Sequence, residues 1–169
     1  MTVSLGPYKV PNRYVPAGLT AADSLLQKKY LMRSRKAYKK GRYIDRPRLR
    51  TFTSKVSPHI LRATTAYGVS TMKPNRNLAR ATGCSQRALE KIVNKGEGAY
   101  YSSGSRPNQT AQSWGYARLA SALTGGPSSL VDYSILKKGC SRRSHPVLLA
   151  NKLKKMGSTG TRKKVKNIL

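Results

Sequence analysis

The sequence predicts a mainly α-helical protein in which several short helices surround a small core. Apolar residues recur at helical spacing in short segments, and Gly or Pro residues separate these segments along the chain. Hydrophobic residues make up only 38% of the 169 residues, which is enough for a small core but not for a large one. We therefore expect a small helical domain at residues 57–156, preceded by an extended arm and a basic helix.

The two ends of the chain lack the pattern of a packed helix. Residues 1–19 contain Pro7, Pro11 and Pro16, and proline both fixes φ and disfavours a helical conformation in the residue before it. We expect this Pro-rich segment to be an extended arm that is ordered only when it lies along a neighbouring chain. Residues 157–169 form a basic tail that we expect to be mobile unless it is bound.

Residues 20–56 are expected to form a basic helix followed by a linker. Thr20 is a typical N-terminal cap, and Asp23 lies three residues later, near the positive end of the helix dipole. Gly41 favours the end of this helix. Within the helical domain, further helices are expected at residues 58–67, 78–82, 86–95, 111–124, 127–138 and 144–156.

Residues 77–96 have the spacing of a helix-turn-helix. Ala79 is small where two helices would cross closely, and Gly83 can adopt the positive φ of a tight turn. In such a motif the second helix can enter the major groove of DNA. The exposed face of that helix would carry Gln86, Arg87, Glu90, Lys91 and Asn94. The alternative is a plain helical hairpin within a small core, and the pattern is too short to decide between the two.

Residues 96–110 are rich in Gly and Ser and are expected to form a loop. Glycine-rich loops can hold phosphate with exposed backbone amides, and Arg106 would add a positive charge. The segment is not a P-loop, because no Gly-Lys-Ser or Gly-Lys-Thr follows the last glycine. A phosphate-binding loop and a purely structural loop both remain open. Tyr100 and Tyr101 would stack on a ligand or pack against the protein.

The charge of the chain is strongly unbalanced, with 34 Lys and Arg residues against five Asp and Glu and a formal net charge of +29. Repulsion on this scale destabilises a compact chain unless something negative balances it. Nucleic acid is the most common such partner, and an anionic membrane surface or an acidic protein surface is an alternative. Tyr30, Tyr38 and Tyr43 lie among the cations, and tyrosine suits stacking on bases. The candidate polyanion-binding residues are Lys28, Lys29, Arg33, Arg35, Lys36, Lys39, Lys40, Arg42, Arg46, Arg48, Arg50, Arg87, Lys91 and Arg106.

The sequence contains no pattern typical of a metal site or a cofactor site. Cys84 and Cys140 are far apart in the sequence from each other and from His59 and His145, so we predict no zinc site. Two free thiols in a reducing compartment and a disulfide between the two cysteines both remain open. No apolar run approaches the roughly 18 residues of a membrane span, and we expect a protein that is made in the cytosol and is not an integral membrane protein.

We also predict that the chain is not an enzyme. No two carboxylates have the spacing that would place them together on one helix, and neither histidine belongs to a recognisable nucleophile motif. No cluster of metal-binding carboxylates accompanies the Ser-rich loop. The five carboxylates are Asp23, Asp45, Glu90, Glu97 and Asp132.

The segment GEGAYYSSGSRPNQTAQSWGYARLASALTGG, followed by Asp132 and by Gly139-Cys140, resembles a block shared by a viral family. The family consists of small basic proteins encoded by large double-stranded DNA viruses of algae and amoebae, with relatives in some phages. The segments YVPAGL and SRKAYKKGRYIDRP are also similar, so the resemblance covers most of residues 14–140. No catalytic residues transfer from this family.

The resemblance implies a virus-encoded protein that is a minor capsid or core component of the particle. We expect a virion structural protein that bridges neighbouring capsid proteins and contacts a polyanion, and that is present in the host cytoplasm during assembly. A DNA-binding protein that uses residues 77–96 in genome packaging or transcription is the alternative. An RNA-binding protein of the ribosomal kind fits the composition, but the viral block argues against it.

Overall fold

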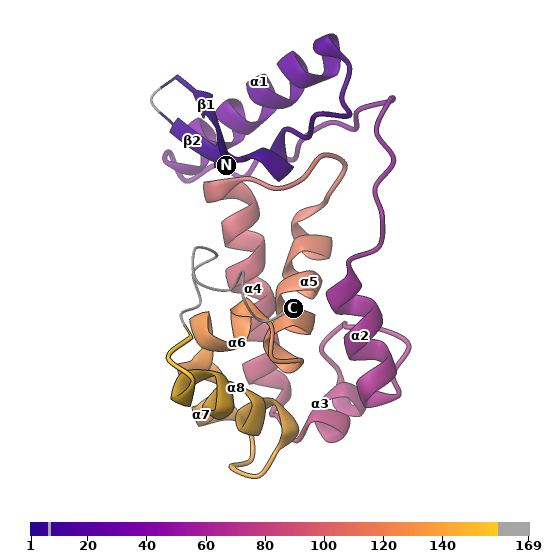
Figure 1. The fold of residues 1–169 in the computed structure, drawn as a ribbon, viewed down its shortest axis with the longest axis vertical. Helices are drawn as coiled ribbons and strands as arrows, with labels where there is room; N and C mark the ends of the chain where they lie inside the picture. Colours follow the sequence, from indigo (N-terminus) through magenta and orange to yellow (C-terminus); the bar gives the residue numbers. More distant parts are fainter. Residues whose placement is uncertain (7, 159–169) are drawn as a thin grey trace. The chain divides into compact units, whose positions relative to one another are not determined.

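The computed structural model describes residues 1–6 and 8–158, and the chain divides into two compact units (Figure 1). Unit 1 contains residues 1–55 and 97–114, and unit 2 contains residues 56–96 and the chain from Gly115 onward. Each unit is therefore built from two separate stretches of sequence. Residues 57–156 were expected to form one domain, whereas the structure groups residues 97–114 with the N-terminal residues.

The prediction of a mainly α-helical chain is confirmed. The unit boundaries fall inside two of the longer helices, so α4 and α5 each contribute one part to unit 1 and another to unit 2. The elements are β1 (Thr2–Leu5), β2 (Tyr8–Pro11), a short 3-10 helix (Asn12–Tyr14), α1 (Ala21–Tyr38), α2 (Pro58–Tyr67), α3 (Arg76–Thr82), α4 (Gln86–Ser103), α5 (Ala111–Leu123), α6 (Pro127–Val131), α7 (Tyr133–Gly139) and α8 (His145–Lys155).

The N-terminal segment of unit 1 is a β-hairpin rather than a free arm. Strands β1 and β2 pair antiparallel, with Leu5 opposite Tyr8. Leu5, Val10 and Tyr14 form a small buried cluster with Leu31 of α1. The extended backbone follows from the prolines, but the segment packs on its own chain because its apolar residues have a partner in α1. The expectation of an arm that needs a neighbouring chain for order is corrected accordingly.

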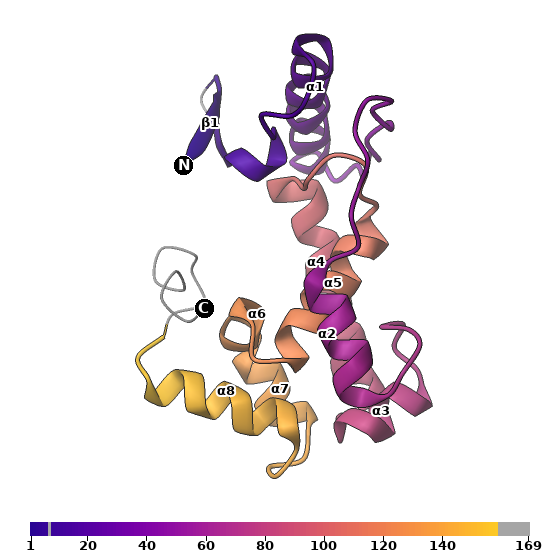
Figure 2. The same ribbon diagram turned by 45° about the vertical axis from the view of Figure 1, so that its right-hand side comes forward.

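The core of unit 2 is formed by apolar residues from α2 to α8. Leu78, Leu89 and Leu123 are fully buried there, together with Leu136. Helices α6, α7 and α8 lie beside one another (Figure 2). This unit therefore has the small multi-helix core that the composition predicts.

Several helix ends lie where the local sequence predicts them. The hydroxyl of Thr20 accepts a hydrogen bond from the backbone N–H of Asp23, at 3.2 Å between oxygen and nitrogen, and caps α1. Helix α2 begins at Pro58, as expected for a proline in the first helical turn. Gly83 ends α3 with a φ of 67°, a conformation that glycine adopts at little cost.

Helix α4 is longer than predicted. It was expected to end at Gly96, but it continues to Ser103, so most of the predicted Gly/Ser loop is helical. An added Cβ at Gly96 would lie 2.6 Å from the Cα of Gly115 on α5. Gly96 therefore permits a close crossing of two helices and does not act as a helix stop. The loop that remains begins at Gly104, whose φ is 97°.

The single helix predicted for residues 127–138 is also two helices in the structure. Helix α6 ends at Val131, Asp132 leaves the helical conformation, and α7 begins at Tyr133. The break places the carboxylate of Asp132 in the core, where it meets two cations. The basic tail lies outside the described residues from residue 159 onward. Among the described helices, none is long and apolar enough to cross a membrane.

Candidate nucleic-acid interface

Helix α1 has one buried face and one exposed face. Asp23, Gln27 and Leu31 are buried, as are Ser34 and Ala37. These positions recur at intervals of three and four residues, which places them on one side of the helix. The side of α1 that carries most of the candidate cations is therefore left for solvent.

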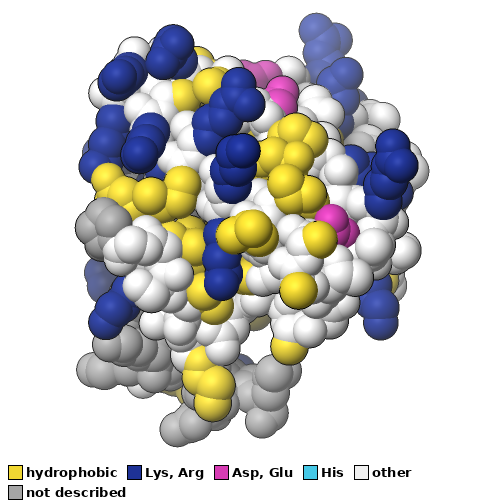
Figure 3. Space-filling view, turned by 90° about the horizontal axis from the view of Figure 1, so that it is seen from above, with side chains coloured by type: hydrophobic (Ala, Val, Ile, Leu, Met, Phe, Trp, Pro, Cys, Tyr) yellow, Lys and Arg dark blue, Asp and Glu magenta, His cyan; other side chains and the backbone are white. Residues whose placement is uncertain are grey.

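The exposed side carries a row of cations that we call the α1 basic stripe. Lys29, Arg33 and Lys36 are exposed and follow one another at helical spacing, and Lys40 continues the row just beyond the helix. At 1.5 Å per residue the stripe is about 16 Å long. One DNA strand presents a phosphate about every 3.4 Å along the axis, so the stripe is long enough to lie beside several phosphates. The acidic residue of α1, Asp23, is buried on the opposite face, so it does not form ion pairs with the cations of the stripe. Figure 3 shows one face of the molecule, where Lys and Arg side chains are interleaved with hydrophobic ones.

Three further candidate cations lie in α1 or directly after it, and two of them contact the hairpin. Lys39 donates a hydrogen bond to the hydroxyl of Tyr8 at 2.8 Å, and the guanidinium carbon of Arg35 lies 4.3 Å from the centre of the same ring. The hydrogen bond from Lys39, and then its charge, lower the pKa of Tyr8 below its ordinary value. Lys28 is half-buried. Arg35 and Lys39 thus contact Tyr8 of the hairpin, and all three cations add positive charge beside the stripe.

Arg46 does not share this exposure. Its Nη1 donates to the hydroxyl of Ser34 and to the carbonyl of Tyr100, both at 3.0 Å, and its Nη2 donates to the hydroxyl of Ser105 at 2.7 Å. Burial is the main cause that lowers the pKa of Arg46 below its ordinary value. The structure therefore assigns Arg46 to the interior of unit 1, and we remove it from the candidate polyanion-binding residues.

The rest of the predicted Gly/Ser loop holds unit 1 together. The side-chain oxygen of Asn108 accepts a hydrogen bond from the backbone N–H of Leu49 at 2.7 Å, and its nitrogen donates to the carbonyl of Leu49 at 3.0 Å. Ser54 donates to the carbonyls of Pro107 and Asn108. These contacts favour the structural role of the loop over phosphate binding. Arg106 is exposed at its edge.

The hydrogen bonds between Asn108 and Leu49 also fix the backbone beside two other candidate cations, Arg48 and Arg50. Arg48 and Arg50 flank the buried Leu49 and are exposed, and Arg42 is exposed in the turn after α1. Because the backbone at Leu49 is fixed, a phosphate that binds Arg48 or Arg50 has to order only their side chains. Unit 1 therefore brings most of the candidate cations of residues 28–50 to its surface.

Arg87 and Lys91 lie in the part of α4 that belongs to unit 2. They are exposed on the same face, one helical turn apart, while Leu89 and Ile92 point into the core. Helix α3, the turn at Gly83 and α4 form two helices joined by a short turn, as the sequence predicts. Whether this pair reads DNA is a separate proposal.

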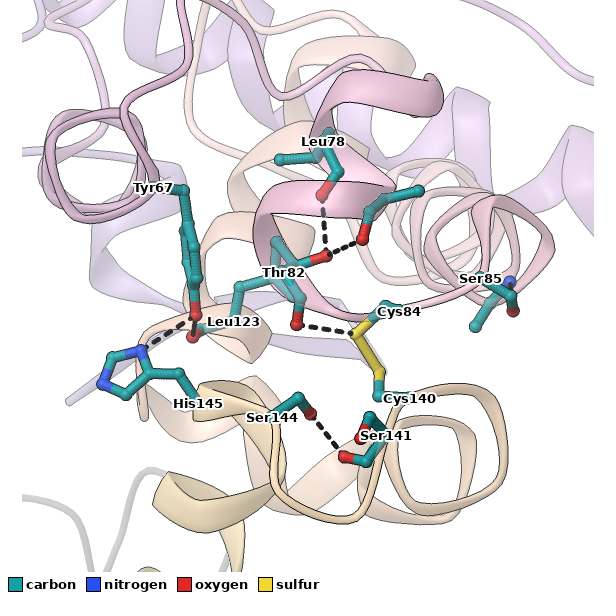
Figure 4. Close-up of a disulfide and its surroundings, with 12 residues drawn as sticks. Tyr67, Leu78, Thr82, Cys84, Ser85, Leu123, Cys140, Ser141, Ser144 and His145 are labelled. Atoms are coloured by element: carbon teal, nitrogen blue, oxygen red, sulfur yellow. Dashed lines mark hydrogen bonds between the residues drawn. A yellow bond between two sulfur atoms is a disulfide. The ribbon is translucent and has the colours of Figure 1, made fainter.

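A disulfide joins the turn of this helix pair to the segment between α7 and α8 (Figure 4). Cys84 and Cys140 are bonded, which decides between the two states that the sequence left open. The backbone N–H of Ser85 donates to the carbonyl of Gly139 at 2.7 Å, and that of Ser141 donates to the carbonyl of Gly83 at 2.8 Å. The segment after Cys140 is thereby fixed beside the turn.

Two exposed cations, Arg142 and Arg143, follow in this fixed segment. These two arginines are not among the cations predicted from the sequence, because they lie far along the chain from residues 77–96. The run Ser-Arg-Arg-Ser directly after Cys140 is the signal that could have found them, but only if the disulfide had been assumed.

Two of the five carboxylates, Asp23 and Asp132, are buried in internal contacts. Asp132 is fully buried and meets Lys95 at 2.8 Å, while Arg118 donates to both of its oxygens at 2.8 and 2.9 Å. Asp23 accepts hydrogen bonds from the backbone and hydroxyl of Thr51. Within the described residues, no three His, Cys, Asp or Glu side chains are grouped as a metal site would require.

Comparisons with known proteins place the chain in a family. No curated protein and no solved structure matches it. A family model matches residues 11–129, which is more than two thirds of the chain. The match includes α1, the hydrogen bonds between Asn108 and Leu49, and the α3–α4 pair. The chain belongs to the family described as a family of unknown function, DUF5824.

Proposed function

We propose that this protein is a non-enzymatic structural protein that binds the phosphate backbone of nucleic acid through the α1 basic stripe, as a minor component of a virus particle. The observation that supports this most directly is the row of exposed cations on α1, which Lys40 continues just beyond the helix, while the acidic residue of α1 is buried. The viral resemblance of the central block supports the particle as its setting. The phosphate backbone is preferred over a membrane surface because the stripe is straight and regularly spaced.

Binding of this kind has a measurable signature. A protein that neutralises phosphates releases condensed counterions, so its affinity falls steeply with salt. The logarithm of the affinity constant for duplex DNA should fall with the logarithm of salt concentration by about 0.9 for each phosphate that the protein neutralises. Because no base edges take part, affinity should depend little on sequence.

The direct test is a fourfold substitution of Lys29, Arg33, Lys36 and Lys40 by Gln. Affinity for labelled duplex DNA should fall, and the salt slope should flatten by about one for each phosphate that is no longer neutralised. A matched variant removes four exposed cations of unit 2 by replacing Arg62, Lys73, Lys138 and Lys152 with Gln. If both variants lose affinity equally, net charge alone explains binding and the stripe is not a site.

The setting in a particle needs its own experiment. Mass spectrometry of purified, nuclease-treated particles should detect the chain in many copies, and its absence would exclude a virion role. The hairpin packs on its own α1, so a bridge to neighbouring capsid proteins would use another surface. Crosslinking within intact particles should identify that surface and the neighbours.

A second candidate function is favoured by the α3–α4 pair in unit 2. Its turn and its exposed Arg87 and Lys91 fit a helix-turn-helix that places α4 in a major groove. Replacing Arg87 and Lys91 by Ala should then weaken duplex binding, whereas replacing Lys137 and Lys138 by Ala should not. If only the stripe variant loses affinity, unit 2 does not bind DNA.

A further inference from the structure

A chain of tyrosine rings in unit 1 runs from the core to solvent. Tyr100 is fully buried, and its ring centre lies 4.9 Å from that of Tyr101. Tyr101 is 5.2 Å from Tyr43, and Tyr43 is 5.9 Å from Tyr38. All three pairs meet edge to face. At the outer part of this chain, Tyr43 remains 68% exposed.

The inner rings are held by polar contacts. The guanidinium carbon of Arg46 lies 3.6 Å from the centre of the Tyr100 ring, and the backbone N–H of Arg46 donates to the Tyr100 hydroxyl at 3.1 Å. The hydroxyl of Tyr101 donates to Asp45 at 2.9 Å. Burial, and then this hydrogen bond, raise the pKa of Tyr101 to about 12, so the hydroxyl keeps its proton near neutral pH. The ring of Tyr43 therefore packs against a tyrosine, Tyr101, that is itself held by a hydrogen bond.

The turn after α1 fixes Tyr43 from the other side. Gly41 has a φ of 71°, and the backbone N–H of Arg42 donates to the carbonyl of Ala37 at 3.0 Å. This turn reverses the chain at the end of the helix and carries two exposed cations, Lys40 and Arg42, directly before Tyr43. A defined backbone thus carries an exposed aromatic ring and, within the three residues before it, two exposed cations.

A single exposed aromatic side chain needs no explanation in an ordinary protein. Here the ring is oriented by Tyr38 and Tyr101, so the entropy cost of ordering it is already met before a ligand arrives. Bases stack on aromatic faces whatever their identity, and nearby cations hold the phosphates of the same strand. A base inside a duplex has both faces covered by its neighbours, so only an unpaired base can use such a ring.

We infer that Tyr43, supported by Tyr38 and Tyr101, is a stacking platform for an unpaired base of single-stranded nucleic acid, whose backbone is held by Lys40 and Arg42. This inference rests on the proposed function and specifies its ligand, since the stripe alone would not distinguish single strands from duplexes. Each part of the platform lies within unit 1.

The experiment compares three labelled probes of equal length: oligothymidylate, an abasic strand with the same phosphates, and a duplex. Oligouridylate is a fourth probe that tests whether RNA serves as well as DNA. Replacing Tyr43 by Ala should lower affinity for oligothymidylate by about tenfold or more, the effect of removing one stacked base. Affinity for the abasic strand and the duplex should not change. Tyr43→Phe should keep the affinity of the unaltered chain.

Two controls separate this inference from the proposed function. Tyr30→Ala removes a tyrosine of α1 outside the platform and should leave all affinities unchanged. The fourfold stripe variant should weaken binding to all probes. If Tyr43→Ala binds oligothymidylate normally while the stripe variant does not, the platform is refuted and the proposed function stands. If the unaltered chain binds no probe, both fail.

Discussion

The guanidinium carbon of Arg46 lies 3.6 Å from the centre of the Tyr100 ring. The same side chain donates hydrogen bonds to Ser34 of α1 and to Ser105 of the loop after α4. One residue from an irregular segment thereby joins two helices of unit 1. The chain has 34 Lys and Arg residues, and Arg46 is one whose charged group makes hydrogen bonds inside the protein.

Replacing Arg46 by Ala should therefore destabilise the protein. Removal of the cation–π interaction and of charged hydrogen bonds should lower the free energy of unfolding by about 2–4 kcal/mol. Urea unfolding followed by circular dichroism measures the change. Arg48→Ala is the matched control, because Arg48 is exposed, and its effect should stay within about 0.5 kcal/mol. Equal effects of the two substitutions would contradict the internal role of Arg46.

Two glycines of α4 should respond in opposite directions to substitution by Ala. At Gly96 the new Cβ would lie 2.6 Å from the Cα of Gly115, so one helix must move, at a cost of about 1–3 kcal/mol. At Gly98 no atom lies within 4 Å of the new Cβ, and the higher helix propensity of Ala should add about 0.5–1 kcal/mol. Thermal unfolding of both variants tests the pair. A gain in stability at Gly96 would mean that the crossing is looser than the structure indicates.

These cases mark what the sequence predicts well and what it does not. The start of α1 at Thr20 and the end of α3 at Gly83 depend on residues within one turn, so local patterns were sufficient. The role of Gly96 depends on Gly115 in another helix, and a sequence pattern cannot distinguish a helix stop from a close crossing. For the same reason the continuation of α4 to Ser103 was missed.

In the candidate site, too, the features that depend on local sequence could be predicted, and those that depend on distant contacts could not. The α1 basic stripe follows from helical spacing, so its exposed face could be predicted from the sequence. The internal role of Arg46 depends on Tyr100 and Ser105, which are distant in sequence. The N-terminal hairpin was missed because the pairing of Leu5 with Tyr8 and its packing on Leu31 are tertiary contacts. Prolines indicated its extended backbone but not its partner.

Reduction of the disulfide should destabilise unit 2. Cys84 and Cys140 are 56 residues apart in the sequence, and closing a loop of that length stabilises a folded chain by about 4 kcal/mol in the chain-entropy description. Dithiothreitol should therefore lower the urea midpoint of the oxidised protein. A variant with both cysteines replaced by Ser should be insensitive to the reductant. Mass spectrometry after alkylation without reduction should find neither thiol modified, and two modified thiols would contradict the bond.

Stability at high pH should depend on Tyr101. Its folded pKa is about 12, raised by burial and by the hydrogen bond to Asp45, whereas tyrosine in an unfolded chain titrates near 10. Between these values the folded state holds the proton more tightly than the unfolded state does, so this contribution to stability falls as pH rises. The contribution is complete below about pH 10 and is lost as pH rises through about 12.

Tyr101→Phe removes the ionisable hydroxyl together with its hydrogen bond, so the comparison must be made across pH and not at one value. The stability difference between the unaltered protein and this variant should be constant below about pH 10 and should decrease steadily above it. Urea unfolding at a series of pH values measures this difference, and ultraviolet absorbance of tyrosinate follows the ionisation itself. A difference that stays constant through pH 12 would show that Tyr101 titrates alike in the folded and unfolded states, and that its contact with Asp45 does not hold the proton.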